Sequence, residues 1–428
     1  MRIVIFTIGS RGDVQPYVAL GLGLHAAGHE VFVATHEPFR EFVTGHGLAF
    51  RTVTSNPQEV LESEEGQRWL NAKNPISFLR QMRQVSKPFI KQGQIEAVES
   101  CRDADAVIFS PVGVVAFHVA EKFGVPAFMG CLQPQGPTRE YPTPMMSPPG
   151  RPLPGWLNRL SHIAFDLGYS LVFRDWLNEW RVKTLELPPF PLASPYRTLI
   201  KRKVPVLYGY SPSVVPKPSD WPPLWHVTGY WFLDERSDWH PPVELARFLE
   251  AGSPPVYVGF GSMATRNARE LTKIAVNALG AAGQRGILLS GWAGLGGAQD
   301  QLPDYVHVVK DVPHAWLFPR MAAVVHHGGA GTTAAGLRSG VPSIVTPVFG
   351  DQPFWGDRVA RLGAGPPPIP QRKLTVEGLA AAIHTATTDA GMRERAAALG
   401  ERIRAEDGVR VAVEAFEQHI NERKQRVQ

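Results

Sequence analysis

The chain has 428 residues, of which 44% are hydrophobic and 19% charged, and its formal net charge at pH 7 is +5. This length exceeds what one ordinary hydrophobic core supports, so we expect two domains. The charge is mild and no block of Lys and Arg stands out, which argues against a nucleic-acid partner. Two cysteines, Cys101 and Cys131, provide neither a disulfide framework nor a metal site, and we expect a cytoplasmic protein.

The first half of the chain alternates strand and helix patterns. Its opening apolar run, residues 2–7, predicts a buried strand and not a signal peptide, because Arg11 and Asp13 follow it without a cleavage site. A strand, a helix and a second strand at this spacing form a βαβ unit, which requires a parallel sheet. The predicted strands cover residues 2–7, 30–34, 106–110 and 126–129.

The second half repeats this pattern, with a predicted helix over residues 267–282. The predicted fold class is therefore α/β, with two doubly wound parallel sheets. Residues 211–242 between the halves are rich in Pro and Trp, which predicts an extended linker. The predicted strands cover residues 256–259, 286–289, 306–308, 322–325 and 343–348, and the predicted domains are 1–220, 221–406 and a terminal helix over 407–428.

Two stretches of the first half have the character of insertions. Residues 133–154 are dense in proline and carry Met145 and Met146 at their centre, which predicts either a flap over an acceptor site or an inert loop. Residues 156–185 carry apolar side chains at helical spacing, including Phe173 and Trp176. These helices either pack in the core or form an apolar wall for an acceptor.

A third stretch predicts a helix with a basic face. Arg80, Arg83, Lys87 and Lys91 share this face, and apolar residues occupy the other. A solvated surface and contact with an anionic membrane both fit the pattern. A membrane span is not predicted, because no segment approaches the ~18–20 apolar residues that spanning requires.

The most informative stretch runs from Val324 to Gln352. Its glycines let the backbone approach a ligand, and the amides at the start of the following helix attract an anion. At most one of His326 and His327 faces that ligand, because neighbours on a strand point to opposite sides. A second strand leads to Asp351 and Gln352, polar groups that suit a sugar at the carboxyl edge of a sheet. The stretch therefore predicts a nucleotide-sugar site.

Two more groups of the second half suit the same ligand. Ser262, in the turn Gly-Phe-Gly-Ser after a predicted strand, offers a hydroxyl and nearby amides to a phosphate. His314 either contacts the base or a phosphate, or packs as an ordinary surface histidine.

Asp13 stands just past the first predicted strand, where an acceptor hydroxyl would meet a base. A carboxylate with a reference pKa of ~3.9 is a weak base, so partial burial must raise its pKa. The alternative is that Asp13 caps the following helix. The turn Gly-Ser-Arg-Gly-Asp does not match the dinucleotide pattern GxGxxG, so an NAD site is disfavoured.

These motifs resemble family 1 glycosyltransferases of the GT-B fold, most closely the branch of sterol glucosyltransferases and antibiotic glycosyltransferases. Residues 9–35 are similar to its opening signature and residues 326–365 to its donor signature, with GFGSM and VPHAWLFPR between them. The resemblance implies two facing Rossmann-like domains, with a C-terminal helix that crosses back to the first.

The resemblance also implies an inverting reaction without a bound metal, in which Asp13 is the base. The nucleotide sugar would bind the second domain and the acceptor the first, with no cofactor besides this co-substrate. The implied donor-binding residues are Ser262, Val312, His314, His327, Gly329, Gly331, Thr332, Asp351 and Gln352.

The chain departs from the family pattern at two informative places. Plant-type relatives carry a histidine where Asp13 stands and hold it with an aspartate, whose place Ser110 takes here. A His–Asp dyad is therefore excluded, and the group that tunes Asp13 stays open. Ala335 replaces a glutamate that grips the ribose in many relatives, so UDP and dTDP donors both remain open, with the sterol branch favouring UDP-glucose.

We therefore expect a UDP-dependent hexosyltransferase that acts on a hydroxyl of a lipophilic acceptor, such as a sterol or a polyketide-like product. One alternative is a dTDP-deoxysugar transferase of antibiotic biosynthesis, and another is an inactive accessory protein that binds a nucleotide sugar. A monomer or weak dimer is expected, with peripheral membrane contact as an option. The acceptor itself is not determined by these residues.

Overall fold

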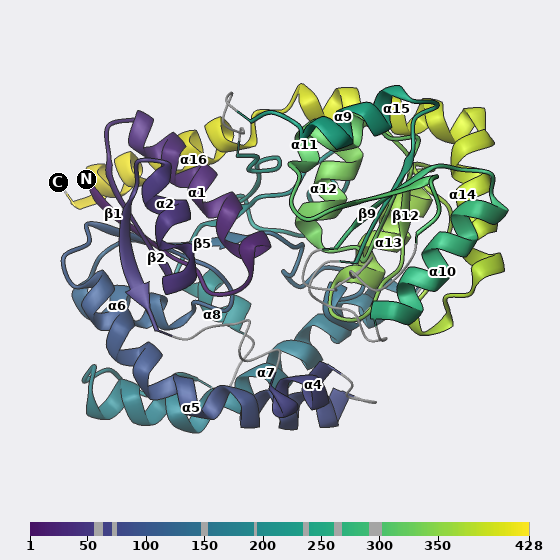
Figure 1. Cartoon of the computed structure of the whole chain (residues 1–428). Helices are drawn as coiled ribbons and strands as arrows, with labels where there is room; N and C mark the ends of the chain where they lie inside the picture. The colour runs from purple at the N-terminus through teal and green to yellow at the C-terminus, as the bar shows by residue number, and fades with distance from the viewer. Residues whose placement is uncertain are drawn as a thin grey trace. The chain divides into compact units, whose positions relative to one another are not determined.

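The computed structural model describes residues 1–54, 63–70, 75–146, 153–191, 195–233, 239–260, 268–290 and 302–427. Within these residues the chain forms two parallel sheets with helices around them (Figure 1). Two compact units result. The first comprises Met1–Thr143, Pro152–Leu233 and Asp407–Gln428, and the second comprises Pro144–Arg151 and Asp234–Glu406.

The sheet of the first unit has the order β3-β2-β1-β4-β5-β6-β7, and its recorded pairings are parallel. β1 lies inside the sheet between β2 and β4, and its apolar residues from Ile3 to Phe6 are fully buried, as a parallel strand covered on both faces requires. The four predicted strands are confirmed, and three were missed. The strands are β1 (Arg2–Phe6), β2 (Glu30–His36), β3 (Ala49–Val53), β4 (Ala106–Phe109), β5 (Ala127–Cys131), β6 (Val206–Tyr208) and β7 (Trp225–Val227).

The Pro- and Trp-rich stretch is not an extended linker over its first part. β7 lies inside it and pairs with β6, and the ring of Trp221 stacks on Tyr208 with centroids 4.4 Å apart. Trp221, Trp225 and Trp231 are all buried. Burial of these large rings outweighs the tendency of proline-rich chain to stay solvated. The first unit therefore extends to Leu233, past the boundary predicted at residue 220.

The C-terminal helix α16 (Gly408–Val427) belongs to the first unit, where it packs against α1 (Arg11–Ala26) (Figure 1). Its buried Phe416 shares one apolar cluster with Val14 of α1. The other helices of this unit are α2 (Arg40–Gly45), α4 (Glu64–Leu70), α5 (Pro75–Cys101), α6 (Val115–Phe123), α7 (Gly155–Lys183) and α8 (Pro195–Lys201), with a short 3-10 turn η1 (Glu37–Phe39).

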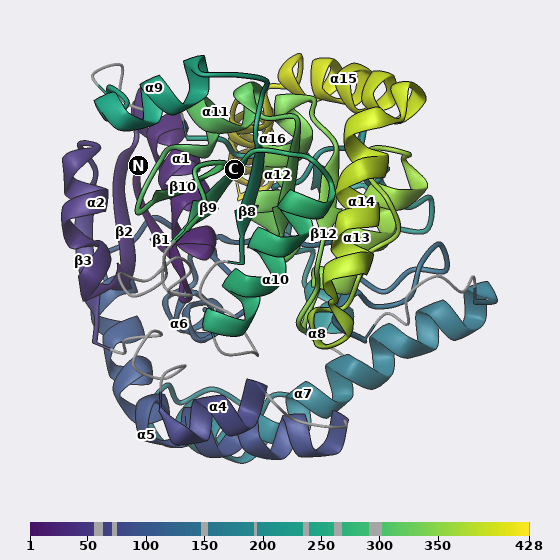
Figure 2. The ribbon, with the colours of Figure 1, turned by 45° about the vertical axis from the view of Figure 1, so that its right-hand side comes forward.

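The long helices α5 and α7 pack against each other (Figure 2). Arg83 of α5 lies 4.2 Å from the ring centroid of Trp176 and forms an ion pair with Asp175 at 3.4 Å. Arg83 is therefore not part of a free basic face, whereas Arg80 and Lys87 are exposed. No helix in the described part of the chain is long and apolar enough to cross a membrane.

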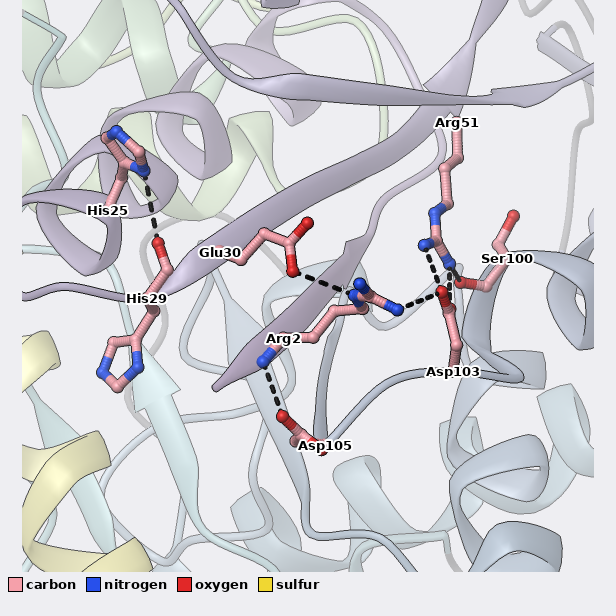
Figure 3. Close-up of polar contacts among 8 residues, drawn as sticks. All are labelled: Arg2, His25, His29, Glu30, Arg51, Ser100, Asp103 and Asp105. Carbon is pink, nitrogen blue, oxygen red and sulfur yellow. Dashed lines mark hydrogen bonds and ion pairs between the residues drawn. The ribbon is translucent and has the colours of Figure 1, made fainter.

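Charged side chains tie the strands together at the amino edge of the first sheet (Figure 3). Arg2 of β1 binds Glu30 of β2 at 3.0 Å and Asp103 at 2.8 Å, and its backbone N–H donates to Asp105. Arg51 of β3 binds the same Asp103 at 2.7 Å. These contacts leave the opposite, carboxyl edge for function.

The sheet of the second unit has the order β10-β9-β8-β11-β12 and is likewise parallel. Its five strands match the five predicted ones. The strands are β8 (Val256–Gly259), β9 (Gly286–Leu289), β10 (Val306–Val309), β11 (Ala323–His326) and β12 (Ser343–Val345). The helices are α9 (Val243–Glu250), α10 (Ala268–Ala281), α11 (His314–Leu317), α12 (Ala330–Ser339), α13 (Gln352–Arg361), α14 (Val376–Thr388) and α15 (Ala390–Arg404), with the 3-10 turns η2 (Pro144–Met146), η3 (Phe318–Arg320) and η4 (Gln371–Lys373).

Candidate active site

Asp13 lies in the first turn of α1, at the carboxyl edge of the first sheet. Its Oδ2 accepts two hydrogen bonds from Ser10, one from the backbone N–H at 2.8 Å and one from Oγ at 2.9 Å. The buried hydroxyl of Thr7 donates to the backbone carbonyl of Asp13 at 2.8 Å. Among the described residues no hydrogen bond reaches Oδ1, so this oxygen can accept a hydrogen bond from another group.

The two interpretations of Asp13 are compatible with each other. Ser10 is the N-cap of α1, and Asp13 is the third helical residue of a capping box, reaching back to the Ser10 amide. This role uses only Oδ2. Ser10 was not predicted to matter for Asp13, although the spacing Ser-x-x-Asp is a sequence signal for a capping box.

Burial raises the pKa of the Asp13 carboxyl, although the two hydrogen bonds from Ser10 act in the opposite direction. A raised pKa makes the carboxylate a stronger base than an exposed aspartate. Ser110, which the resemblance puts in the place of a plant-type aspartate, accepts a hydrogen bond from the Gly113 amide through Oγ at 3.1 Å. Burial and the two hydrogen bonds from Ser10 thus determine the pKa of Asp13.

The glycine-rich turn of the second unit follows β11, where the two adjacent histidines have separate environments. His326 is fully buried, and its Nδ1 accepts a hydrogen bond from the Gly328 amide at 3.0 Å. His327 is half-buried, and its Nε2 lies 2.5 Å from where a Cβ on Gly329 would stand. Gly329 is the N-cap of α12, so only His327 lies beside the amides at the start of that helix.

Burial lowers the pKa of His327 to about 4, so its imidazole is neutral near pH 7. A neutral imidazole donates from one ring nitrogen only. Its Nδ1 is buried and has no hydrogen-bond partner among the described residues. The neutral imidazole of His327 is therefore suited to donate one hydrogen bond to a diphosphate.

Thr332 and Thr333 differ in burial, as His326 and His327 do. Thr333 is fully buried, with an Oγ1 that has no partner among the described residues, whereas Thr332 is partly exposed. Gly331 is exposed, and a Cβ added there would meet no described atom within 4 Å. The side of α12 that bears Gly331 and Thr332 is therefore the side that a ligand can reach.

Gly331→Ala should separate folding from donor binding. Gly331 lies inside α12, and alanine favours a helix over glycine by up to about 1 kcal/mol, so thermal stability should hold or rise slightly. Donor affinity, measured by calorimetry with UDP, should fall because the methyl group occupies space needed by the diphosphate. Unchanged UDP affinity would place the diphosphate elsewhere.

Asp351 and Gln352 lie where β12 gives way to α13. Asp351 Oδ2 accepts a hydrogen bond from the Trp355 indole at 2.7 Å. The buried Gln352 Oε1 accepts from the backbone amides of Val348 and Phe349 at 2.7 and 3.3 Å. The Gln352 carbonyl therefore shapes the loop, and a sugar hydroxyl would have to interact with its amide nitrogen.

Val312 and His314, which were expected to contact the base of the nucleotide, are packed into the second unit. The side chain of Val312 is buried in an apolar cluster, so its contact with a base would come from the backbone. The ring of His314 stacks on Phe318 with centroids 4.3 Å apart, and its Nε2 lies 3.4 Å from the Tyr257 hydroxyl. Gly259 aligns with His326 in the β8–β11 register, and Ser262, three residues later, lies outside the described residues.

The predicted acceptor residues separate into two places. Met145, in η2, belongs to the second unit, where its Cε lies 4.0 Å from the position of a Cβ on Gly350. The side chain of Met146 lies outside the described residues. Phe173 and Trp176 lie on α7, where Phe173 contacts Tyr169 at a centroid distance of 5.0 Å and Trp176 packs under Arg83. Phe173 and Trp176 are half-buried, and Leu160 and Leu171 of the same helix are exposed, so the core interpretation of α7 and the acceptor wall both stay predictions.

In the described part of the chain, no group of three or more His, Cys, Asp or Glu is placed to hold a metal ion.

Two family models match the chain. The N-terminal domain of glycosyltransferase family 28 matches residues 3–142, and the C-terminal domain of erythromycin biosynthesis protein CIII-like proteins matches residues 288–413. Among solved structures, the glycosyltransferase of kitacinnamycin has a TM-score of 0.71 with 21% identity, covering 97% of this chain and 98% of that one. This likeness confirms the predicted GT-B fold.

Curated relatives extend the likeness along the sequence. A sterol 3-beta-glucosyltransferase of Arabidopsis thaliana is 39% identical over 426 residues, covering 98% of this chain and 68% of the relative. A sterol 3-beta-glucosyltransferase of Emericella nidulans is 40% identical over 429 residues, covering 97% of this chain but only 30% of the relative. The chain thus belongs to the sterol 3-beta-glucosyltransferase family of GT-B glycosyltransferases.

Proposed function

We propose that the protein transfers glucose from UDP-glucose to the hydroxyl of a sterol, with inversion at the anomeric carbon. The observation that carries this proposal is the identity of about two fifths with sterol 3-beta-glucosyltransferases across nearly the whole chain. The half-buried carboxylate of Asp13 and the neutral His327 beside the α12 N-terminus support it chemically.

The reaction needs one base and one stabilised leaving group. The acceptor oxygen attacks the anomeric carbon as the bond from that carbon to the diphosphate breaks, and UDP leaves. Asp13 Oδ1 takes the proton of the hydroxyl as the new C–O bond forms. The amides at the start of α12 and the N–H of His327 stabilise the negative charge that develops on the departing diphosphate.

The choice between UDP and dTDP depends on the ribose site. Ala335 supplies no carboxylate there, and its small side chain packs partly buried against an apolar cluster of the second unit. The sterol relatives favour UDP-glucose as the donor. Peripheral membrane contact through α5 and a monomeric or weakly dimeric state stay predictions.

Product analysis tests the function. The purified protein should convert UDP-glucose and a 3β-hydroxysterol to a steryl glucoside, detected by mass, and UDP should compete for the donor site better than dTDP in calorimetry. A panel of polyketide-like alcohols with dTDP-sugars serves as the comparison. Transfer only within that panel would support the deoxysugar alternative, and donor binding without any transfer would support the accessory protein.

A further inference from the structure

A histidine on the neighbouring strand holds the turn that carries Asp13. His36 is the last residue of β2, and its side chain is fully buried. Its Nε2 accepts a hydrogen bond from the backbone N–H of Gly9 at 3.1 Å. An amide N–H only donates, so Nε2 of His36 must present a lone pair at this contact.

Gly9 lies directly behind the carboxylate of Asp13. Its φ of +145° is a conformation that favours glycine, and a Cβ there would stand 2.4 Å from Asp13 Oδ2. The next residue, Ser10, donates both hydrogen bonds to that same oxygen. A displacement of Gly9 therefore moves the surface behind the carboxylate and the donors that hold it.

The second unit contains the same type of contact in its own functional turn. There the fully buried His326 accepts a hydrogen bond from the amide of Gly328, whose φ is +89°. In both units a buried imidazole accepts from a positive-φ glycine between a strand and the helix whose first turn carries the proposed chemistry. The recurrence argues that the contact serves the turn and is not an accident of packing.

We propose that His36 is a positioning residue for Asp13. By accepting the Gly9 N–H, it holds the turn 9–10 against β2 and so aims Oδ1 of Asp13 at the acceptor hydroxyl. His36 itself exchanges no proton with the substrates. The inference rests on the proposed role of Asp13 as the base.

Two substitutions of His36 test its contact with Gly9, because the side chains of Gln and Asn differ by one methylene group. In His36→Gln the side-chain oxygen reaches the place of Nε2 and can accept the Gly9 N–H, whereas in His36→Asn it falls short. We expect His36→Asn to lower kcat by about 10–100-fold, because small misplacements of a catalytic group have effects of this size. His36→Gln should recover most of that loss. The donor KM should change little in both, because the donor residues lie in the second unit.

Two measurements distinguish positioning from a general loss of structure. His118→Gln removes another buried histidine of the first unit and should leave kcat per folded molecule unchanged. The amide of Gly9, followed by NMR hydrogen exchange, should lose protection in His36→Asn and keep it in His36→Gln.

Equal kcat in the Asn and Gln variants, or wild-type protection of Gly9 in His36→Asn, would overturn the inference. If the wild-type protein transfers no sugar at all, the proposed function fails instead. The exchange rate of the Gly9 amide would still decide whether His36 holds the turn.

Discussion

Asp13→Asn should reduce the transfer rate by about 10²–10⁴-fold, the range that removal of a general base usually produces. Asparagine keeps an oxygen that can accept the Ser10 amide, so the cap of α1 should survive and stability should change little. UDP affinity should also hold, because the proposed donor residues lie in the second unit. Steady-state kinetics and calorimetry on the same preparation measure both effects.

The asparagine variant is sharper than alanine here, because alanine would remove the base and the helix cap together. Ser10→Ala is the matched control, since it alters the cap but leaves the carboxylate in place. Turnover of Asp13→Asn at the wild-type rate would remove Asp13 from the mechanism.

The largest effect on stability should come from a buried ion cluster between α6 and α7. Arg181 has no exposed side-chain surface, and its Nη1 binds Glu121 Oε2 at 2.9 Å. The same guanidinium lies 2.7 Å from the ring of His118 and donates to the Pro188 carbonyl at 2.9 Å. Burial alone would raise the pKa of the Glu121 carboxyl, but hydrogen bonds from Arg181 and Arg202 hold it well below its usual range.

Arg181→Met should destabilise the protein by up to about 3–5 kcal/mol, because it removes a fully buried guanidinium that binds Glu121, His118 and the Pro188 carbonyl. The partly buried Glu121 then keeps Arg202, at 2.5 Å, as its counter-charge. The double variant Arg181→Met with Glu121→Gln should recover part of this loss. Urea unfolding followed by tryptophan fluorescence measures both.

Arg410→Met is the surface control, since its pair with Glu414 at 2.6 Å is more than half exposed on both sides. It should shift the urea midpoint very little. A similar shift for Arg181→Met and Arg410→Met would mean that the buried cluster contributes no more than a surface pair.

The elements that could be predicted from the sequence are those marked by a pattern of neighbouring residues. Strands such as β1 and β11 are continuous apolar runs with turn residues after them, and both were predicted. β6 and β7 are only three residues each, too short to show a periodicity, so neither was found. Tyr196 and Tyr208, which pack on Trp225 of β7, lie outside the Pro- and Trp-rich stretch, so the composition of that stretch alone did not reveal β7.

The candidate site shows the same division. The glycines, His327 and Asp13 could be predicted because their residue types and spacing along the chain are typical of such a site. The hydrogen bond that His36 accepts from Gly9 depends on β1 and β2 being neighbours in the sheet, and no spacing along the chain reveals this. The orientation of Gln352 Oε1 into its own loop was likewise invisible, because it depends on the backbone path after β12.

Proton transfer to the half-buried Asp13 carboxylate should be visible in the pH dependence of kcat/KM. The base form is lost as pH falls through a raised pKa, so activity should decline at a pH above the ordinary aspartate value of ~3.9. Ser10→Ala removes the Oγ donor that lowers this pKa and keeps the backbone donor. The acid limb of the Ser10→Ala profile should therefore move to higher pH, and a limb at the wild-type pH would contradict proton transfer to Asp13.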